Sequence, residues 1–177
     1  MPALVRAHGV DVDPRRIYAI GGSMGGQEVL LLLARHPRLL AGAAAFDPDT
    51  DLARRYWDFA RLPHGASLQR LAREEIGGTP LTAPAAYAAR SPDSYARQIA
   101  LSGVPLQLYW STRDRVISDQ RDETAALAAA VLGWNPQAPL QVFRGTWQHT
   151  AEMRWRRRLP QSLVRFGLLT RSRAMQI

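Results

Sequence analysis

The stretch Gly21-Gly22-Ser23-Met24-Gly25-Gly26 is the feature that most constrains the fold of this 177-residue chain. Its G-x-S-x-G pattern lies between a short apolar run, Ile17–Ile20, and a segment of helical character, Gln27–His36. A turn this tight requires small residues beside the serine, and it lifts the hydroxyl above the end of the strand. The N–H that follows the serine then faces a developing oxyanion. The pattern therefore predicts a nucleophile at Ser23 and an oxyanion donor at Met24.

The sequence excludes two other kinds of glycine-rich turn at residues 21–26. A phosphate-binding loop needs a lysine after its last glycine, and the chain has no lysine at all. A dinucleotide-binding turn needs G-x-G-x-x-G, and this turn does not have that spacing.

Strand and helix patterns alternate along the rest of the chain. Three further apolar runs are separated by helical or irregular segments, which favours parallel strands joined by right-handed crossovers. We expect an α/β fold: a largely parallel sheet of about four strands with helices on both faces. The expected strands after Ile17–Ile20 are Leu39–Phe46, Pro105–Trp110 and Pro139–Phe143, and the later helices are Asp119–Leu132, capped by Ser118 and ended by Gly133, and one that begins near Thr150 and is interrupted at Pro160.

Residues 48–104, between the second and third expected strands, are less regular. Turn residues break this region into short helical pieces, and we expect no strand in it. It is the expected cap or specificity region. Its aromatic side chains are the candidates for lining a substrate pocket, although simple packing explains them equally well: Tyr56, Trp57 and Phe59.

An acid and a base follow Ser23 in the order that a Ser-Asp-His triad requires. Asp114 comes just after the expected strand Pro105–Trp110, and His149 comes just after Pro139–Phe143. Because the carboxyl ends of parallel strands meet at one edge of a sheet, the three side chains are expected to converge there. We assign His149 as the base that activates Ser23 and Asp114 as the acid that orients the imidazole.

Other titratable residues fit these roles less well. Asp47, directly after the second strand, is the alternative acid. The remaining histidines are expected at the surface: His8, His36 and His64. Asp119 and Asp122 are interpreted as helix-start residues that complement the helix dipole.

Nucleic-acid binding is an alternative function to consider, because the net charge is +8 and basic proteins bind phosphate backbones. All 23 basic residues are arginines, which is more typical of a compositional bias than of a binding surface. The densest basic cluster, Arg154 with Trp155 and residues 156–158, is expected to be the solvated face of a helix. No nucleic-acid partner is predicted. The chain has no cysteine, no apolar run long enough to span a membrane and no visible signal peptide, so its compartment is undetermined.

These motifs resemble the α/β-hydrolase superfamily and, within it, the prolyl oligopeptidase-like serine hydrolases. The similar stretches are Asp13–Tyr18 leading into Gly22–Gly26, then Arg90–Tyr95 before Val104–Leu106, and the acid loop that ends in Asp114–Ile117. The chain departs from the family at Trp110-Ser111, where relatives usually have His-Gly, and at Gln148, often a glycine in relatives. Neither change removes a catalytic group.

The resemblance implies a serine hydrolase that cleaves a small ester or peptide substrate, with no cofactor and no metal. Esterase and peptidase activity both remain open. In this fold the serine turn follows the fifth strand, so residues 1–177 resemble the C-terminal half, a single partial domain without the loop that carries the second oxyanion donor. We therefore expect an exposed edge strand at Ile17–Ile20, possible self-association through it and weak catalysis. The alternative function is an inactive fragment that acts as an interaction module.

Overall fold

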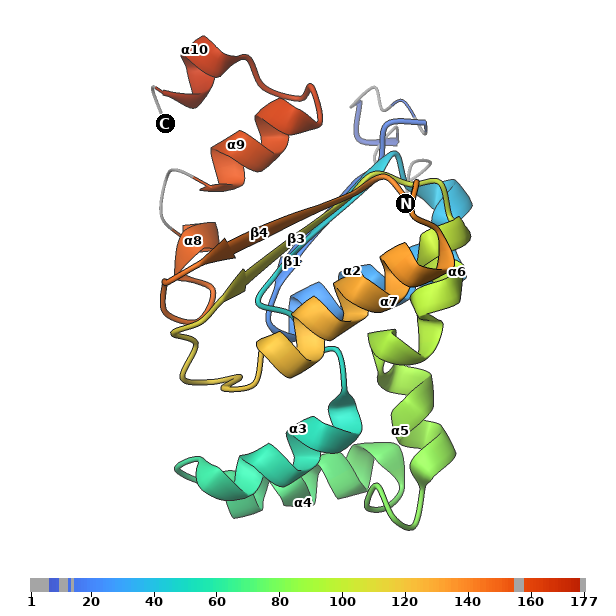
Figure 1. The fold of residues 1–177 in the computed structure, drawn as a ribbon, viewed down its shortest axis with the longest axis vertical. Coiled ribbons are helices and arrows are strands. Elements are labelled where there is room, and N and C mark those ends of the chain that lie inside the picture. The colour runs from blue at the N-terminus through green and yellow to red at the C-terminus, as the bar shows by residue number, and fades with distance from the viewer. Residues whose placement is uncertain (1–6, 10–12, 14, 155–157, 176–177) are drawn as a thin grey trace.

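The computed structural model describes residues 7–9, 13, 15–154 and 158–175. A four-stranded sheet lies at its centre (Figure 1), in the order β1-β2-β3-β4 with every neighbouring pair parallel. The strands are β1 (Tyr18–Gly22), β2 (Gly42–Phe46), β3 (Leu106–Ser111) and β4 (Leu140–Gly145). The expected α/β class and strand number are therefore confirmed.

The two inner strands are the most deeply buried parts of the chain, since every residue of β2 and β3 is buried. Successive side chains point to opposite faces of the sheet, and two separate apolar clusters result. Ala43, Ala45 and Leu108 belong to one cluster, and Ala44 and Tyr109 to the other. Burial on both faces explains why these strands read as continuous apolar runs.

Helices cover both faces of the sheet, as Figure 1 shows. On one face, α2 (Met24–Arg35), α6 (Ala96–Leu101) and α7 (Ala126–Trp134) contribute to the larger cluster. On the other face, Met153 of α8 (Ala151–Arg154) and Phe166, next to α9 (Arg158–Arg165), pack against Phe46 and Tyr109. The remaining elements are η1 (Pro37–Leu39) and α10 (Arg171–Ala174).

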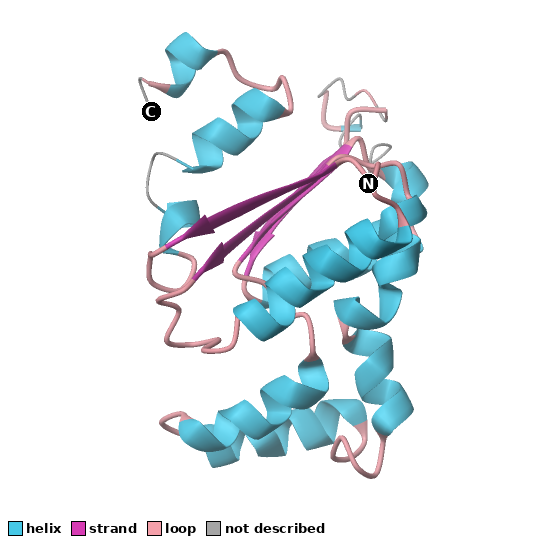
Figure 2. Ribbon diagram, in the orientation of Figure 1, coloured by secondary structure: helices cyan, strands magenta, loops and turns pink. Residues whose placement is uncertain are grey.

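Residues 48–104, all of which the structure describes, contain helices and no strand, as expected (Figure 2). Three of these helices, α3, α4 and α5, lie away from the sheet, whereas α6 packs on it. Asp51 begins the first of them, since its carboxylate accepts a hydrogen bond from the Arg54 N–H at 3.0 Å. The elements of this region are α3 (Leu52–Asp58), η2 (Phe59–Arg61), α4 (Gly65–Ile76), α5 (Pro84–Arg90), η3 (Pro92–Tyr95) and α6.

The segment after β3 differs from the expectation. No helix begins at Asp119; a π-helical turn, η4 (Arg121–Ala125), leads into α7 instead. Gly133 was predicted to end this helix, and that prediction is wrong, because α7 continues to Trp134, whose ring lies under the Arg97 guanidinium at 5.5 Å. Pro160 lies inside α9, in its first turn, where a missing N–H costs little.

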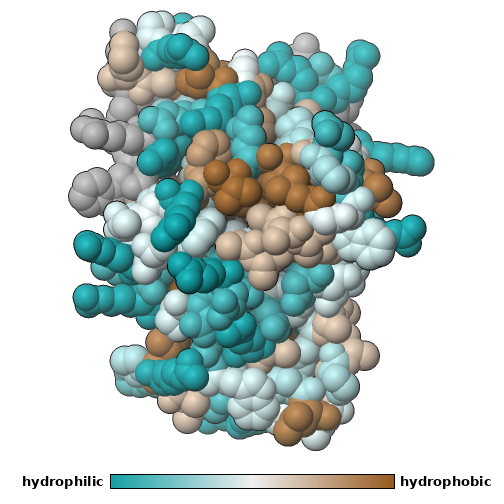
Figure 3. All heavy atoms as spheres, in the orientation of Figure 1, coloured by the Kyte–Doolittle hydropathy of each residue, from teal (hydrophilic) through white to brown (hydrophobic). Residues whose placement is uncertain are grey.

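The outer strands are less covered than the inner ones. The expected edge, β1, is half-buried along most of its length, whereas β4 exposes Gln141, Val142 and Arg144. Figure 3 shows apolar residues gathered across the middle of the viewed face, between more polar regions. In the part of the chain that the structure describes, no helix is both long enough and apolar enough to cross a membrane.

Candidate active site

Ser23 occupies the turn between β1 and α2, as the sequence predicts. Its φ of 56° lies in the left-handed region, a strained conformation for a residue with a side chain. Backbone hydrogen bonds hold it: the Ser23 N–H donates to the Phe46 carbonyl at 2.9 Å, and the Ser23 carbonyl accepts from Gly26 at 2.9 Å. A Cβ atom at Gly21 would lie only 2.3 Å from the Gly25 carbonyl oxygen, so this position requires glycine.

Met24 is the first residue of α2, and its side chain is exposed. The first N–H groups of a helix have no acceptor within the helix, and among the described residues nothing else accepts a hydrogen bond from the Met24 N–H. This group, together with the positive end of the helix dipole, can therefore stabilise an anion beside Ser23.

Asp114 and His149 meet at the carboxyl ends of β3 and β4. Asp114 Oδ2 lies 2.7 Å from His149 Nδ1, and the two side chains are 1% and 16% exposed. Asp114 Oδ1 accepts hydrogen bonds from the N–H groups of Val116 at 2.8 Å and Ile117 at 2.9 Å. Because a carboxylate only accepts, the imidazole carries its proton on Nδ1 and leaves Nε2 free to act as a base.

The loop that carries His149 packs against the strand that carries Ser23. A Cβ atom on Gly22 would lie 3.1 Å from Thr150 Cγ2 and 3.0 Å from Met153 Sδ. Among the described residues no hydrogen bond joins Ser23 Oγ to His149. Apo structures often have long or poorly aligned catalytic contacts that tighten only with substrate, so a direct Ser23–His149 contact stays a prediction.

Asp47, the alternative acid, contacts the same loop at other atoms. Its carboxylate is fully buried, and Oδ2 accepts from Trp147 Nε1 at 2.8 Å and from the Thr150 N–H at 2.7 Å. Burial raises the pKa of Asp47 to about 6, against the opposing effect of these two hydrogen bonds. The carboxylate that reaches His149 Nδ1 is therefore that of Asp114, and the contacts of Asp47 are ones that the sequence did not reveal.

The other histidines, His8, His36 and His64, are exposed, as expected. The basic cluster near residue 155 lies largely outside the described residues. Asp119 and Asp122 lie before and within η4, where both contact Arg54.

The three aromatic candidates for a substrate pocket differ in their surroundings. Tyr56 is 3% exposed and packs edge-on against Tyr87, which leaves it no open surface. Trp57 is exposed on α3, and Phe59 lies under the Arg55 guanidinium, whose central carbon is 4.9 Å from the ring centre. Of the three, Trp57 is the most exposed.

A second group of buried acids lies under α3, behind the acid loop. The side chains of Arg55 and Asp49 are each 8% exposed and form an ion pair, with Nε and Oδ2 3.6 Å apart. Glu123 Oε2 accepts a hydrogen bond from the Thr50 N–H at 3.2 Å. Burial raises the pKa of Asp49 to about 7 and that of Glu123 to about 8. Arg55 Nη1 also donates to the Val116 carbonyl, within the loop that holds Asp114.

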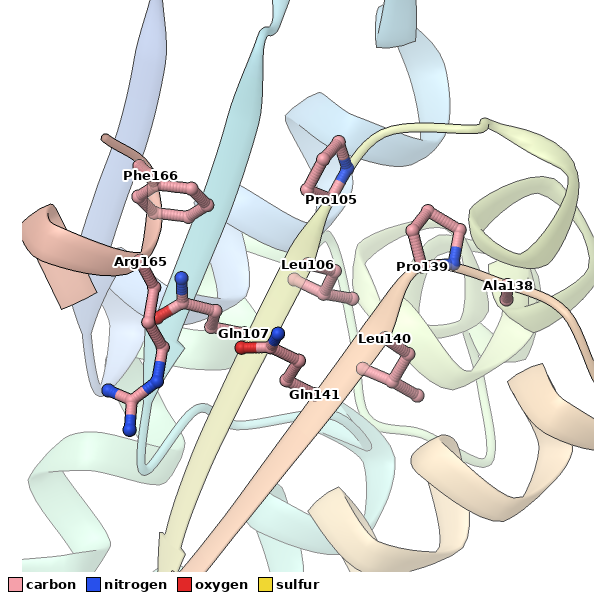
Figure 4. Close-up of a pocket in the computed structure, with 9 residues that line it drawn as sticks. All are labelled: Pro105, Leu106, Gln107, Ala138, Pro139, Leu140, Gln141, Arg165 and Phe166. Atoms are coloured by element: carbon pink, nitrogen blue, oxygen red, sulfur yellow. The ribbon is translucent and has the colours of Figure 1, made fainter. Parts of the chain in front are cut away.

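A cavity of about 260 Å³ lies at the opposite ends of the strands, between the sheet and α9 (Figure 4). Gln107 and Gln141 reach into it from β3 and β4, and Arg165 and Phe166 cover it. Because it lies at the amino ends of the strands, it is separate from the site formed by Ser23, Asp114 and His149.

The sequence profile of the prolyl oligopeptidase family matches residues 3–144, which is more than half of the chain and includes Ser23 and Asp114. The chain belongs to the prolyl oligopeptidase family. A search of curated proteins finds no match.

Solved structures resemble this family member in fold. The acylaminoacyl peptidase of Pyrococcus horikoshii is 19% identical with a TM-score of 0.68, over 93% of this chain and 25% of that one. The dipeptidyl peptidase 4 of Porphyromonas gingivalis is 22% identical with a TM-score of 0.60, over 78% of this chain and 17% of that one. An esterase of Pyrococcus furiosus is 20% identical with a TM-score of 0.58, over 86% of this chain and 54% of that one. The chain therefore spans at most about half the length of these relatives.

Proposed function

We propose that the protein is a serine hydrolase that cleaves an ester or peptide bond through an acyl-Ser23 intermediate. The observation that carries this proposal is the Asp114–His149 contact of 2.7 Å at the same end of the sheet as a serine with a φ of 56°. Membership of the prolyl oligopeptidase family supports it. Both peptidases and an esterase occur among the similar structures, so the proposal covers both bond types.

The reaction proceeds in two halves. In the first, His149 Nε2 takes the proton from Ser23 Oγ as Oγ bonds to the substrate carbonyl carbon, and the N–H of Met24 stabilises the oxyanion. The imidazolium, paired with Asp114, returns the proton to the leaving alcohol or amine, and the bond to that group breaks. In the second half, His149 takes a proton from water as the water oxygen bonds to the acyl carbon, and it then gives this proton to Ser23 Oγ as the bond from Oγ to the acyl carbon breaks and the acid is released.

Hydrolysis of p-nitrophenyl acetate tests this proposal. Ser23→Ala should lower the rate on the order of a thousandfold or more. The matched control is Ser67→Ala, because Ser67 is an exposed serine on α4, away from the sheet, and its loss should leave the rate unchanged. Equal rates for Ser23→Ala and the wild type would overturn the proposal.

A second proposal is self-association through the outer edge of β1, which among the described residues pairs with β2 alone. Unpaired strand edges are templates for pairing with another chain. Sedimentation velocity over a concentration series should then report a dimer or larger species, and a single monomeric species at all concentrations would exclude it.

A further inference from the structure

Asp47 is a buried carboxylate that the reaction above does not use. It follows β2 directly, it has no exposed surface, and its N–H donates to the Tyr109 carbonyl at 2.8 Å, which anchors it to β3. Burying a charged side chain so completely is costly unless its hydrogen bonds compensate. The partners of Asp47 should therefore indicate why the residue is there.

Those partners flank His149. Asp47 Oδ2 accepts from the Trp147 indole at 2.8 Å and from the Thr150 N–H at 2.7 Å. One oxygen atom of Asp47 thus holds both Trp147, two residues before His149, and Thr150, one residue after it. The Trp147 ring is also immobilised, because it packs so tightly on Gly145 that a Cβ there would lie 1.8 Å from Cζ3.

Backbone strain is concentrated at the same contact. Four described residues other than glycine have a positive φ, and three of them are Ser23 at 56°, Asp47 at 42° and Thr150 at 53°. Such conformations are strained and persist only where the surrounding contacts enforce them. The hydrogen bond from Thr150 to Asp47 joins two of these residues directly and offsets part of their strain.

Asp47 also acts on the imidazole through its charge. A carboxylate oxygen of Asp47, a carboxylate oxygen of Asp114 and a ring nitrogen of His149 lie within 4.8 Å of one another. The two charged groups that act on the Asp47 carboxylate here are Asp114, which raises its pKa, and His149, which lowers it. An ionised Asp47 therefore places a negative charge beside the imidazolium that forms when Ser23 gives up its proton.

From these contacts we propose that Asp47 is a positioning residue that fixes the loop 147–150 and thereby holds His149 between Asp114 and Ser23. This inference rests on the proposed function. Asp114 orients the imidazole ring at Nδ1, and Asp47 fixes the backbone that carries the ring, so the two carboxylates have separate tasks.

The test compares Asp47→Asn and Trp147→Phe with the wild type on p-nitrophenyl acetate. Each variant removes part of the contact: asparagine keeps the shape without the charge, and phenylalanine keeps an aromatic ring, although a smaller one, without the indole donor. We expect kcat to fall about tenfold to a hundredfold with KM within about twofold, since the loss affects the orientation of the base and not substrate binding. The acid limb of the pH–rate profile of Asp47→Asn should move to lower pH.

Asp58→Asn is the matched control, because Asp58 is also buried and also has one carboxylate oxygen without a partner among the described residues, but it pairs with Arg61. It should keep the wild-type kcat and pH profile. Wild-type kcat in both Asp47→Asn and Trp147→Phe, with Ser23→Ala inactive, would overturn the positioning role alone. Full activity of Ser23→Ala would instead contradict the proposed function.

Discussion

Two groups of buried acids lie on either side of the acid loop, and they differ in what their oxygens contact. Around His149, the carboxylates of Asp114 and Asp47 accept short hydrogen bonds from loop backbone and ring nitrogens. Under α3, Asp49 forms an ion pair with Arg55, whose charge also acts on Glu123, and Glu123 accepts a hydrogen bond from the Thr50 N–H. The first arrangement orients a base, whereas the second joins a helical segment to the sheet.

Val116 connects the two groups. Its N–H donates to Asp114 Oδ1, and its carbonyl accepts from Arg55 Nη1. Substitutions around His149 should therefore reduce turnover with little change in stability, whereas substitutions around Arg55 should first reduce stability.

The largest effect is expected from the contact between Asp114 and His149. Asp114→Asn and His149→Ala should each lower kcat on p-nitrophenyl acetate by about ten-thousandfold, and the double variant should be little worse than either one, because the two residues act as a unit. Thermal unfolding should change much less than turnover. Additive losses in the double variant would show that the residues act separately.

Arg55→Met should have the next largest effect, on stability. It removes the cation paired with Asp49 and the donor to the Val116 carbonyl, and breaking a buried ion pair costs about 3–5 kcal/mol. Urea unfolding measures this loss. Arg54→Met is the control on the same helix, since Arg54 is 37% exposed in its ion pairs with Asp119 and Asp122, and exposed pairs contribute about 1 kcal/mol at most. Equal losses in the two variants would contradict a special role for the buried group.

A smaller effect is expected from pH. Burial raises the pKa of Asp49 to about 7 and of Glu123 to about 8, whereas both titrate near about 4 in an unfolded chain. The folded state therefore keeps protons that the unfolded state releases, and this contribution to stability is full below about pH 4 and is lost as the pH rises through 7 and 8. Stability should therefore fall steadily between about pH 5 and about pH 9.

Glu123→Gln checks this assignment, because it removes the group with the higher pKa. The fall in stability toward alkaline pH should become shallower in this variant. The matched control is Glu75→Gln, which changes an exposed acid on α4 and should leave the slope unchanged. A wild-type slope in Glu123→Gln would mean that other groups set the pH dependence.

The sequence predicted most of the fold because the inner strands are buried on both faces and therefore appear as nearly continuous apolar runs, with Gln107 as the polar exception inside β3. It failed where tertiary contacts decide the local structure. Gly133 appeared to be a helix end, yet α7 runs on to Trp134, which packs under Arg97. The π-helical turn before α7 follows from buried side-chain contacts, among them a hydrogen bond from Thr124 to Gln120 at 2.5 Å, and periodicity does not reveal these.

For the site, the order of residue types and their places after strands were enough to predict the contact between Asp114 and His149. The contacts of Asp47 could not be predicted from the sequence, because they depend on the conformations of the loops that follow β3 and β4. The hydrogen bonds from Val116 and Ile117 turn Asp114 toward the imidazole, and the Thr150 N–H turns toward Asp47. Tyr56 was a pocket candidate by its chemistry alone, and the structure buries it against Tyr87.

Reaction with a fluorophosphonate probe, followed by intact-mass analysis and peptide mapping, most directly tests whether His149 activates Ser23. Only a base-activated serine reacts well with such a probe. One adduct per chain is expected, located on Ser23, that is absent in Ser23→Ala and forms far more slowly in His149→Ala. Labelling of His149→Ala at the wild-type rate, or an adduct on another serine, would contradict this activation.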